Sequence, residues 1–171
     1  AVVEENGNIS NSYKDTFPDW SQQGSGIMQD AVWLLLTEAG LAASLQHMGT
    51  TFRNAAASLL SETLEDAIGA FLEHDRSPAR KLGGIDCRGS HFYLALYWAR
   101  ALAGHAGDNP LRSRFAPLAR LLGENEERIH AELIAAQGHP VDMGGYYHPD
   151  IARTTAAMRP SPVLNRIIDD A

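Results

Sequence analysis

The residues of this sequence best suited to chemistry are basic side chains clustered in one short stretch. Within residues 76–91 lie Arg76, Arg80, Lys81, Arg88 and His91. Guanidinium groups present forked donors that match phosphate oxygens, and the amides at the start of the helix predicted after this stretch add a positive dipole end. The stretch therefore favours binding of a nucleotide phosphate or a small carboxylic acid. The alternative is a solvated connector whose charges are paired in salt bridges.

A second stretch holds residue types that bind metals, namely His139, Asp142, His148 and Asp150. Their spacing matches no standard zinc or calcium pattern. The glycines and tyrosines between them favour a tight turn, so we predict no metal site here.

The single cysteine, Cys87, lies among basic groups, a setting that can activate a thiol. His91 follows four residues later, but no third group completes a nucleophile, base and orienting residue. We therefore assign no catalytic residue.

Helices must position these residues, because apolar side chains recur at helical spacing along most of the chain. Gly40 is a candidate helix end, and residues 41–47 read equally well as a short strand or as more helix. The predicted fold is mainly α, a bundle of five to seven helices with irregular loops and little or no β-sheet, packed around the helix at 91–102. The predicted helices cover residues 25–40, 54–76, 91–102, 110–122, 124–136, 151–158 and 165–169.

Composition limits the class of protein. The 171 residues fit one domain, and a net charge of −7 argues against partners such as nucleic acid or anionic membranes. No apolar run is long enough to span a bilayer, and one cysteine excludes an internal disulfide, so we expect a cytoplasmic protein. Residues 1–48 hold six acids and one base, and therefore most of the negative charge. This uneven distribution of charge along the chain suggests two segments of different character.

Three motifs support a resemblance that covers residues 41–171. They are Ser77-Pro-Ala-Arg-Lys81, the run from Arg88 to Trp98, and Gly144-Gly-Tyr-Tyr-His-Pro149. Together they resemble the C-terminal part of monomeric NADP-dependent isocitrate dehydrogenase. Ala79 and Cys87 depart from the family pattern, which has serine and asparagine there.

The resemblance implies oxidative decarboxylation of isocitrate to 2-oxoglutarate with NADP and a divalent Mg or Mn ion. It assigns the 2′-phosphate of NADP to Arg80, with Lys81 as a helper, and we include Arg88 as a cofactor-binding residue. The metal and isocitrate ligands belong to other parts of the family enzyme. The chain by itself is therefore expected to be inactive.

Residues 1–47 resemble a different family. Phe17-Pro18, Trp20-Ser21 and the run from Glu38 to His47 are similar to the middle of an FMN-dependent nitroreductase, in which a helix leads into a strand near the flavin. We therefore divide the chain into residues 1–47 and 48–171 and interpret it as a chimera. The resemblance implies FMN and a homodimer. A further alternative is a non-catalytic helical scaffold, and uncovered apolar surface would favour homo-oligomers.

Overall fold

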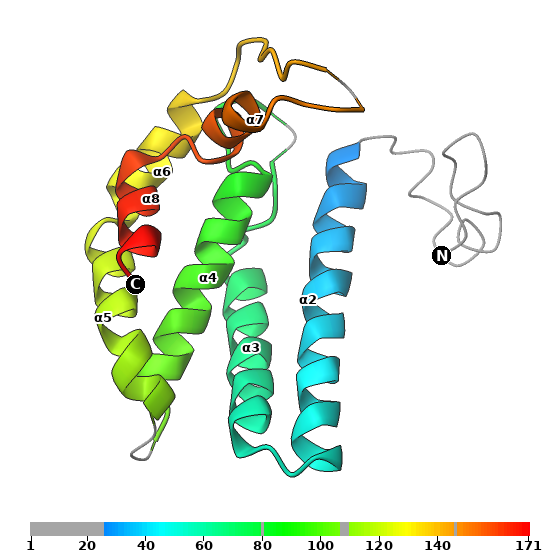
Figure 1. Cartoon of the computed structure of the whole chain (residues 1–171), viewed down its shortest axis with the longest axis vertical. Coiled ribbons are helices and arrows are strands. Elements are labelled where there is room, and N and C mark those ends of the chain that lie inside the picture. The colour runs from blue at the N-terminus through cyan, green and yellow to red at the C-terminus, as the bar shows by residue number, and fades with distance from the viewer. Residues whose placement is uncertain (1–25, 80, 107–109, 146) are drawn as a thin grey trace, which may run out of the picture.

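The computed structural model describes residues 26–79, 81–106, 110–145 and 147–171, with side chains from residue 37 onward. These ranges form seven helices and no strand, which confirms a mainly α fold (Figure 1). The helices are α2 (Gly26–Thr51), α3 (Ala55–Glu73), α4 (Cys87–Gly104), α5 (Pro110–Glu124), α6 (Glu126–Ala135), α7 (Ile151–Met158) and α8 (Pro162–Asp169).

Helix α2 continues through the glycine that we expected to end it. Gly40 lies in mid-helix, at a position where a Cβ would meet no other atom within 4 Å. A glycine in a helix costs only about 1 kcal/mol relative to alanine, and the flanking residues favour helix strongly enough to absorb this. Residues 41–47 are consequently helical, and one continuous helix spans the predicted boundary between residues 47 and 48.

Helices α2 and α3 form an antiparallel hairpin through small residues. The Ser61 hydroxyl donates to the Ala42 carbonyl at 2.8 Å, and a Cβ on Gly49 would lie 2.9 Å from the Ser58 backbone nitrogen. The turn between the helices holds Arg53 in the left-handed region, with φ 51°. Asn54 then caps α3 by accepting from the Ala57 amide at 3.1 Å. The two helices approach closely because their contact residues carry little bulk.

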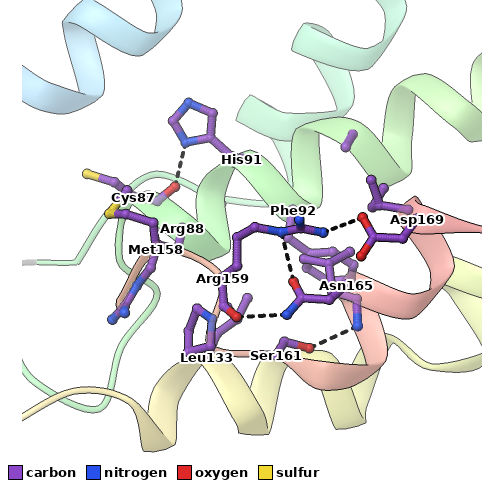
Figure 2. A pocket seen from close by; sticks show the side chains of 14 residues that line it. Cys87, Arg88, His91, Phe92, Leu133, Met158, Arg159, Ser161, Asn165 and Asp169 are labelled. Atoms are coloured by element: carbon purple, nitrogen blue, oxygen red, sulfur yellow. Dashed lines mark hydrogen bonds and ion pairs between the residues drawn. The ribbon is translucent and has the colours of Figure 1, made fainter. Parts of the chain in front are cut away.

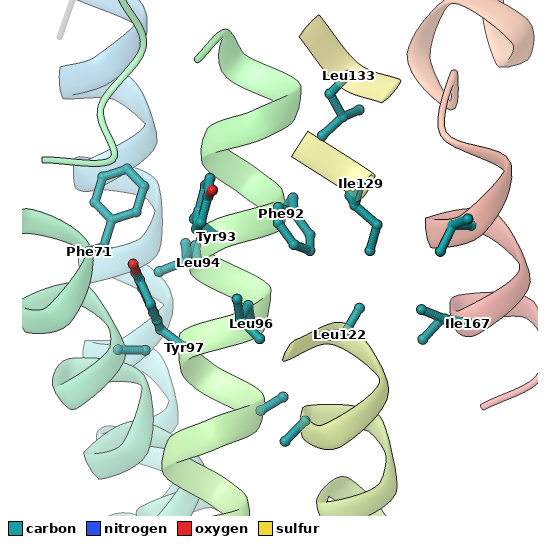
Figure 3. Packing of buried hydrophobic residues seen from close by; sticks show 14 residues of the cluster. Phe71, Phe92, Tyr93, Leu94, Leu96, Tyr97, Leu122, Ile129, Leu133 and Ile167 are labelled. Carbon is teal, nitrogen blue, oxygen red and sulfur yellow. The ribbon is translucent and has the colours of Figure 1, made fainter. Parts of the chain in front are cut away.

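Helix α4 lies in the middle of the bundle, as its apolar residues predicted. Helices α3 and α2 lie to one side of it, and α5, α6 and α8 lie to the other (Figure 1). Its side chains enter the core from both sides, and Leu96 is fully buried (Figure 3). Phe71 of α3, Leu122 of α5 and Ile129 of α6 pack in the same cluster. The core therefore depends on α4 more than on any other helix described.

A hydrogen-bonded corner fixes the C-terminal helix on this core. The Ser161 side chain caps α8 by accepting from the Leu164 amide, and it donates to Glu132 of α6 at 2.7 Å. This bond lowers the pKa of Glu132, against the smaller opposing effect of burial. None of the described helices is both long enough and apolar enough to cross a membrane.

Candidate nucleotide-phosphate site

Residues 76–79 and 81–86 of the predicted basic stretch form a closed loop between α3 and α4, here called the cationic loop (residues 76–86). The helix predicted from residue 91 begins earlier, at Cys87, because Asp86 caps it, so Arg88 and His91 lie on α4 and not in the loop. Its base is closed by the Ala79 amide, which donates to the Ile85 carbonyl at 2.6 Å. The Gly84 amide donates back to the Lys81 carbonyl at 3.3 Å, and Gly83 takes a left-handed φ of 86°. Lys81 is exposed at this turn and makes no side-chain hydrogen bond or ion pair with any described residue. Arg80 lies outside the described residues.

The start of α4 is already capped by a carboxylate. Asp86 accepts from the Gly89 amide at 3.1 Å through Oδ1. The predicted anion at this helix start would compete with that carboxylate. Burial alone would raise the pKa of Asp86, but hydrogen bonds from Arg88 and the Gly89 amide outweigh it and hold the pKa below its usual value. The carboxylate is therefore charged and occupies the anion position of the helix.

Arg88 joins the loop to α7. Its Nε and Nη2 donate to Asp86 Oδ2 at 2.9 and 2.6 Å, and its Nη1 donates to the Ala157 carbonyl at 2.8 Å. Each guanidinium nitrogen thus has a protein partner. A nucleotide phosphate would have to displace one of these bonds, so the geometry favours Lys81 over Arg88 as a phosphate ligand.

Arg76 is engaged in a similar way. Its Nε donates to the Tyr97 hydroxyl at 3.2 Å, and its guanidinium lies 4.1 Å from the centre of the Tyr93 ring. Its carbonyl accepts from the Ser90 hydroxyl at 2.8 Å. The hydrogen bond to Tyr97 is the largest contribution to the raised pKa of Arg76. The interpretation of this stretch as a salt-bridged connector therefore describes Arg88. Arg76 contacts tyrosines instead of an acid, and Lys81 has no side-chain partner among the described residues.

Sequence reasoning missed the residue that holds the loop from outside, Gln137. Its Oε1 accepts from the Gly83 amide at 3.1 Å, and its Nε2 donates to the Gly84 carbonyl at 3.0 Å. The sequence offers one signal for it, because the pair Gln137-Gly138 also resembles the dehydrogenase family.

A cavity of about 390 Å³ lies between the cationic loop and the end of α6. Lys81, Asp86 and Arg88 line it from the loop side, and Gln137 and His139 line it from the other. Cavities of this size hold small ligands or parts of larger ones. A cation, an amide and an imidazole around it suit an anionic oxygen group, and the Asp86 carboxylate in the same lining is paired with Arg88. The residues present therefore fit a nucleotide phosphate.

Residues 139–145 and 147–150 form an irregular stretch with a turn at the glycines, as predicted. Gly144 takes φ 78°, and its amide donates to Asp142 at 2.9 Å. Asp142 also pairs with Arg153, and Asp150 caps α7 by accepting from the Arg153 amide. Tyr147 is largely exposed. Among the described residues no group of three or more His, Cys, Asp or Glu side chains could hold a metal ion.

A second cavity, of about 460 Å³ and mostly apolar, lies between α4 and α8 (Figure 2). Arg159 closes one side by donating to Asn165 at 3.2 Å and to Asp169 at 2.7 Å. Cys87 and His91 line the α4 side, and a ring nitrogen of His91 bonds the Cys87 carbonyl at 2.6 Å. These two residues therefore lie beside the apolar cavity rather than facing Lys81.

Residues 32–169 match the family model of monomeric isocitrate dehydrogenase, and the chain belongs to this family. The NADP isocitrate dehydrogenase of Azotobacter vinelandii is 53% identical over 125 residues, which is 73% of this chain and 17% of that protein. The proteins named NADP isocitrate dehydrogenase 2 in Colwellia maris and Mycobacterium tuberculosis are 50% and 49% identical, each over 75% of this chain and 17% of their own length.

The chain thus spans about a sixth of the length of these relatives. The family match begins at residue 32, upstream of the start at residue 41 that the motifs indicated. The division into residues 1–47 and 48–171 stays a prediction.

Proposed function

We propose that this chain is the part of an NADP-dependent isocitrate dehydrogenase that recognises the 2′-phosphate of NADP. Lys81 binds this phosphate, and Arg80, its neighbour in sequence, is the second ligand. The observation that carries the proposal is the contrast around the cavity. Lys81 is exposed and has no side-chain partner in the described part of the chain, whereas Arg88 is bound to Asp86 and Ala157. The names of the relatives, all NADP isocitrate dehydrogenases, agree with it.

The chemistry in which this binding would take part is oxidation and decarboxylation of isocitrate, with hydride passing to NADP when the nucleotide is bound. The residues of this chain contribute recognition of the nucleotide. Lys81 supplies a positive charge for the phosphate, and Arg88 holds the loop on α7. A cytoplasmic location belongs to the same proposal.

Substitution of Lys81 by alanine is expected to weaken NADP binding about tenfold, because one charge-assisted hydrogen bond to phosphate is lost. Isothermal titration calorimetry of the full chain at fixed salt measures this. Arg166→Ala is the matched control, since Arg166 is exposed on α8 and lies outside the cavity. Equal affinities for Lys81→Ala and the unmodified chain would refute the assignment of Lys81.

The 171-residue chain by itself is expected to form no NADPH from isocitrate. It spans 17% of the length of its relatives, and the resemblance assigns the metal and isocitrate ligands to other parts of the family enzyme. An absorbance assay with isocitrate, NADP and Mg²⁺ or Mn²⁺ tests this. Turnover that depends on both the metal and isocitrate would show that the chain holds a complete catalytic site.

The nitroreductase-like function with FMN, the non-catalytic scaffold and the homo-oligomer stay predictions. Two observations favour the dehydrogenase for residues 32–47. The family match includes them, and residues 41–47 are helical where the nitroreductase resemblance implies the start of a strand. Of the remaining residues of the nitroreductase-like segment, 26–31 are helical and 1–25 lie outside the described residues.

A further inference from the structure

We propose that Gln137 is the positioning residue of the cationic loop, holding Lys81 where it meets the nucleotide phosphate. This inference rests on the proposed function, because it supplies the reason why the loop needs a fixed shape. Gln137 lies more than 50 residues away from the loop in sequence and is half-buried beside it.

The Gln137 side chain binds two consecutive peptide groups at once. A carboxamide is a neutral side chain that accepts and donates in one plane. Its oxygen takes the Gly83 amide proton at 3.1 Å, and its nitrogen donates to the Gly84 carbonyl at 3.0 Å. The backbone of Gln137 is itself fixed at the end of α6, where its amide donates to the Ile134 carbonyl at 3.1 Å. The contact therefore ties the loop to a rigid helix.

The two glycines are the part of the loop that most needs such a support. Gly83 has a left-handed φ of 86°, and a Cβ on Gly84 would lie 2.5 Å from the Ala79 Cβ. Glycine is required at both positions, but glycine also loses the most conformational freedom when it is ordered. Lys81 stands at the start of this turn, since its carbonyl accepts from the Gly84 amide. Fixing the glycines therefore fixes the backbone that carries Lys81.

Removal of the carboxamide should act on the nucleotide more than on the fold. The loop lies at the surface, and its base is still closed by the Ala79–Ile85 hydrogen bond and by Arg88. Without the Gln137 carboxamide the turn adopts several conformations, and part of the free energy of NADP binding is spent on ordering it. The loss should concern the 2′-phosphate, which NAD lacks.

Replacement of Gln137 by methionine, which keeps the length of the side chain but removes both hydrogen bonds, tests the proposal in the full chain. Calorimetry is expected to show about tenfold weaker binding of NADP with little change for NAD. Hydrogen exchange of the Gly83 amide should become faster, while the thermal midpoint stays near that of the unmodified chain. Gln46→Met on the exposed surface of α2 is the matched control.

Gln137→Glu is the second variant. It keeps an acceptor for the Gly83 amide but offers no donor to the Gly84 carbonyl, and it adds a negative charge beside Asp86 in the cavity that Lys81 also lines. NADP binding should weaken more than in Gln137→Met, and most strongly at low salt.

Unchanged NADP affinity in both variants would overturn the positioning role. Equal losses for NADP and NAD would also overturn it, because they indicate a general structural defect. If the unmodified chain binds no NADP, the proposed function fails. Amide exchange then decides the anchoring separately, since unchanged exchange at Gly83 in Gln137→Met would show that Gln137 does not hold the loop.

Discussion

Truncation of Leu96 to alanine is expected to lower the free energy of unfolding by about 2–5 kcal/mol. Leu96 is fully buried in the middle of α4, and this helix contacts α3, α5 and α6. The lost methyl groups leave a cavity that the surrounding helices cannot close without moving together.

Urea denaturation followed by circular dichroism measures the loss. Leu82→Ala is the matched control, because Leu82 is 77% exposed and the same truncation there should change stability by less than about 0.5 kcal/mol. Similar losses in the two variants would contradict the central position of α4 in the core.

Replacement of Asp86 by alanine is expected to cost about 2–4 kcal/mol and to weaken nucleotide binding as well. The substitution removes the cap of α4 and the carboxylate that pairs with Arg88. The Arg88 side chain is only 19% exposed, so water compensates poorly for the lost counterion. The cationic loop then loses its link through Arg88 to α7 and keeps the Ser90–Arg76 hydrogen bond to α4. Denaturation and NADP titration on the same sample measure both effects.

Asp86→Asn separates the two contributions to that loss. Asparagine keeps a cap acceptor for the Gly89 amide but cannot neutralise Arg88, so its cost should lie between those of the unmodified chain and Asp86→Ala. The pH dependence has a defined sign. Because the folded-state pKa of Asp86 is lowered, its stabilisation is present above the unfolded value near 3.9 and is lost as the pH falls through the folded-state pKa. An Asp86→Asn variant with the acid sensitivity of the unmodified chain would contradict this assignment.

Local sequence signals predicted most of the helices. Residues 151–158 were predicted as a helix with the bounds that α7 has, and the helix predicted from Asn54 corresponds to α3 with Asn54 as its cap. The prediction that α2 ends at Gly40 was wrong because a glycine ends a helix only where the backbone turns into the left-handed region. In α2 this happens after Thr51, where Arg53 has the left-handed φ. Proline is also an incomplete stop signal here, because α5 continues past Pro117.

The sequence predicted which residue types form the candidate site but not which contacts they make. The cluster of bases was visible in the sequence, but the contacts of Arg88 with Ala157 and of Gln137 with Gly83 join segments more than 50 residues apart. Such contacts depend on how α6 and α7 pack against the loop, which no local pattern encodes. Sequence reasoning could therefore list the cations but could not tell that Lys81, unlike Arg76 and Arg88, has no side-chain partner where the structure describes the chain.

The affinity of the full chain for NADP relative to NAD tests the central claim most directly, because the two nucleotides differ only in the 2′-phosphate. Calorimetric titration of the unmodified chain at low, fixed salt is expected to show at least about tenfold tighter binding of NADP. This preference should fall about tenfold in Lys81→Ala. Equal affinities for the two nucleotides, or no binding of NADP, would contradict the account.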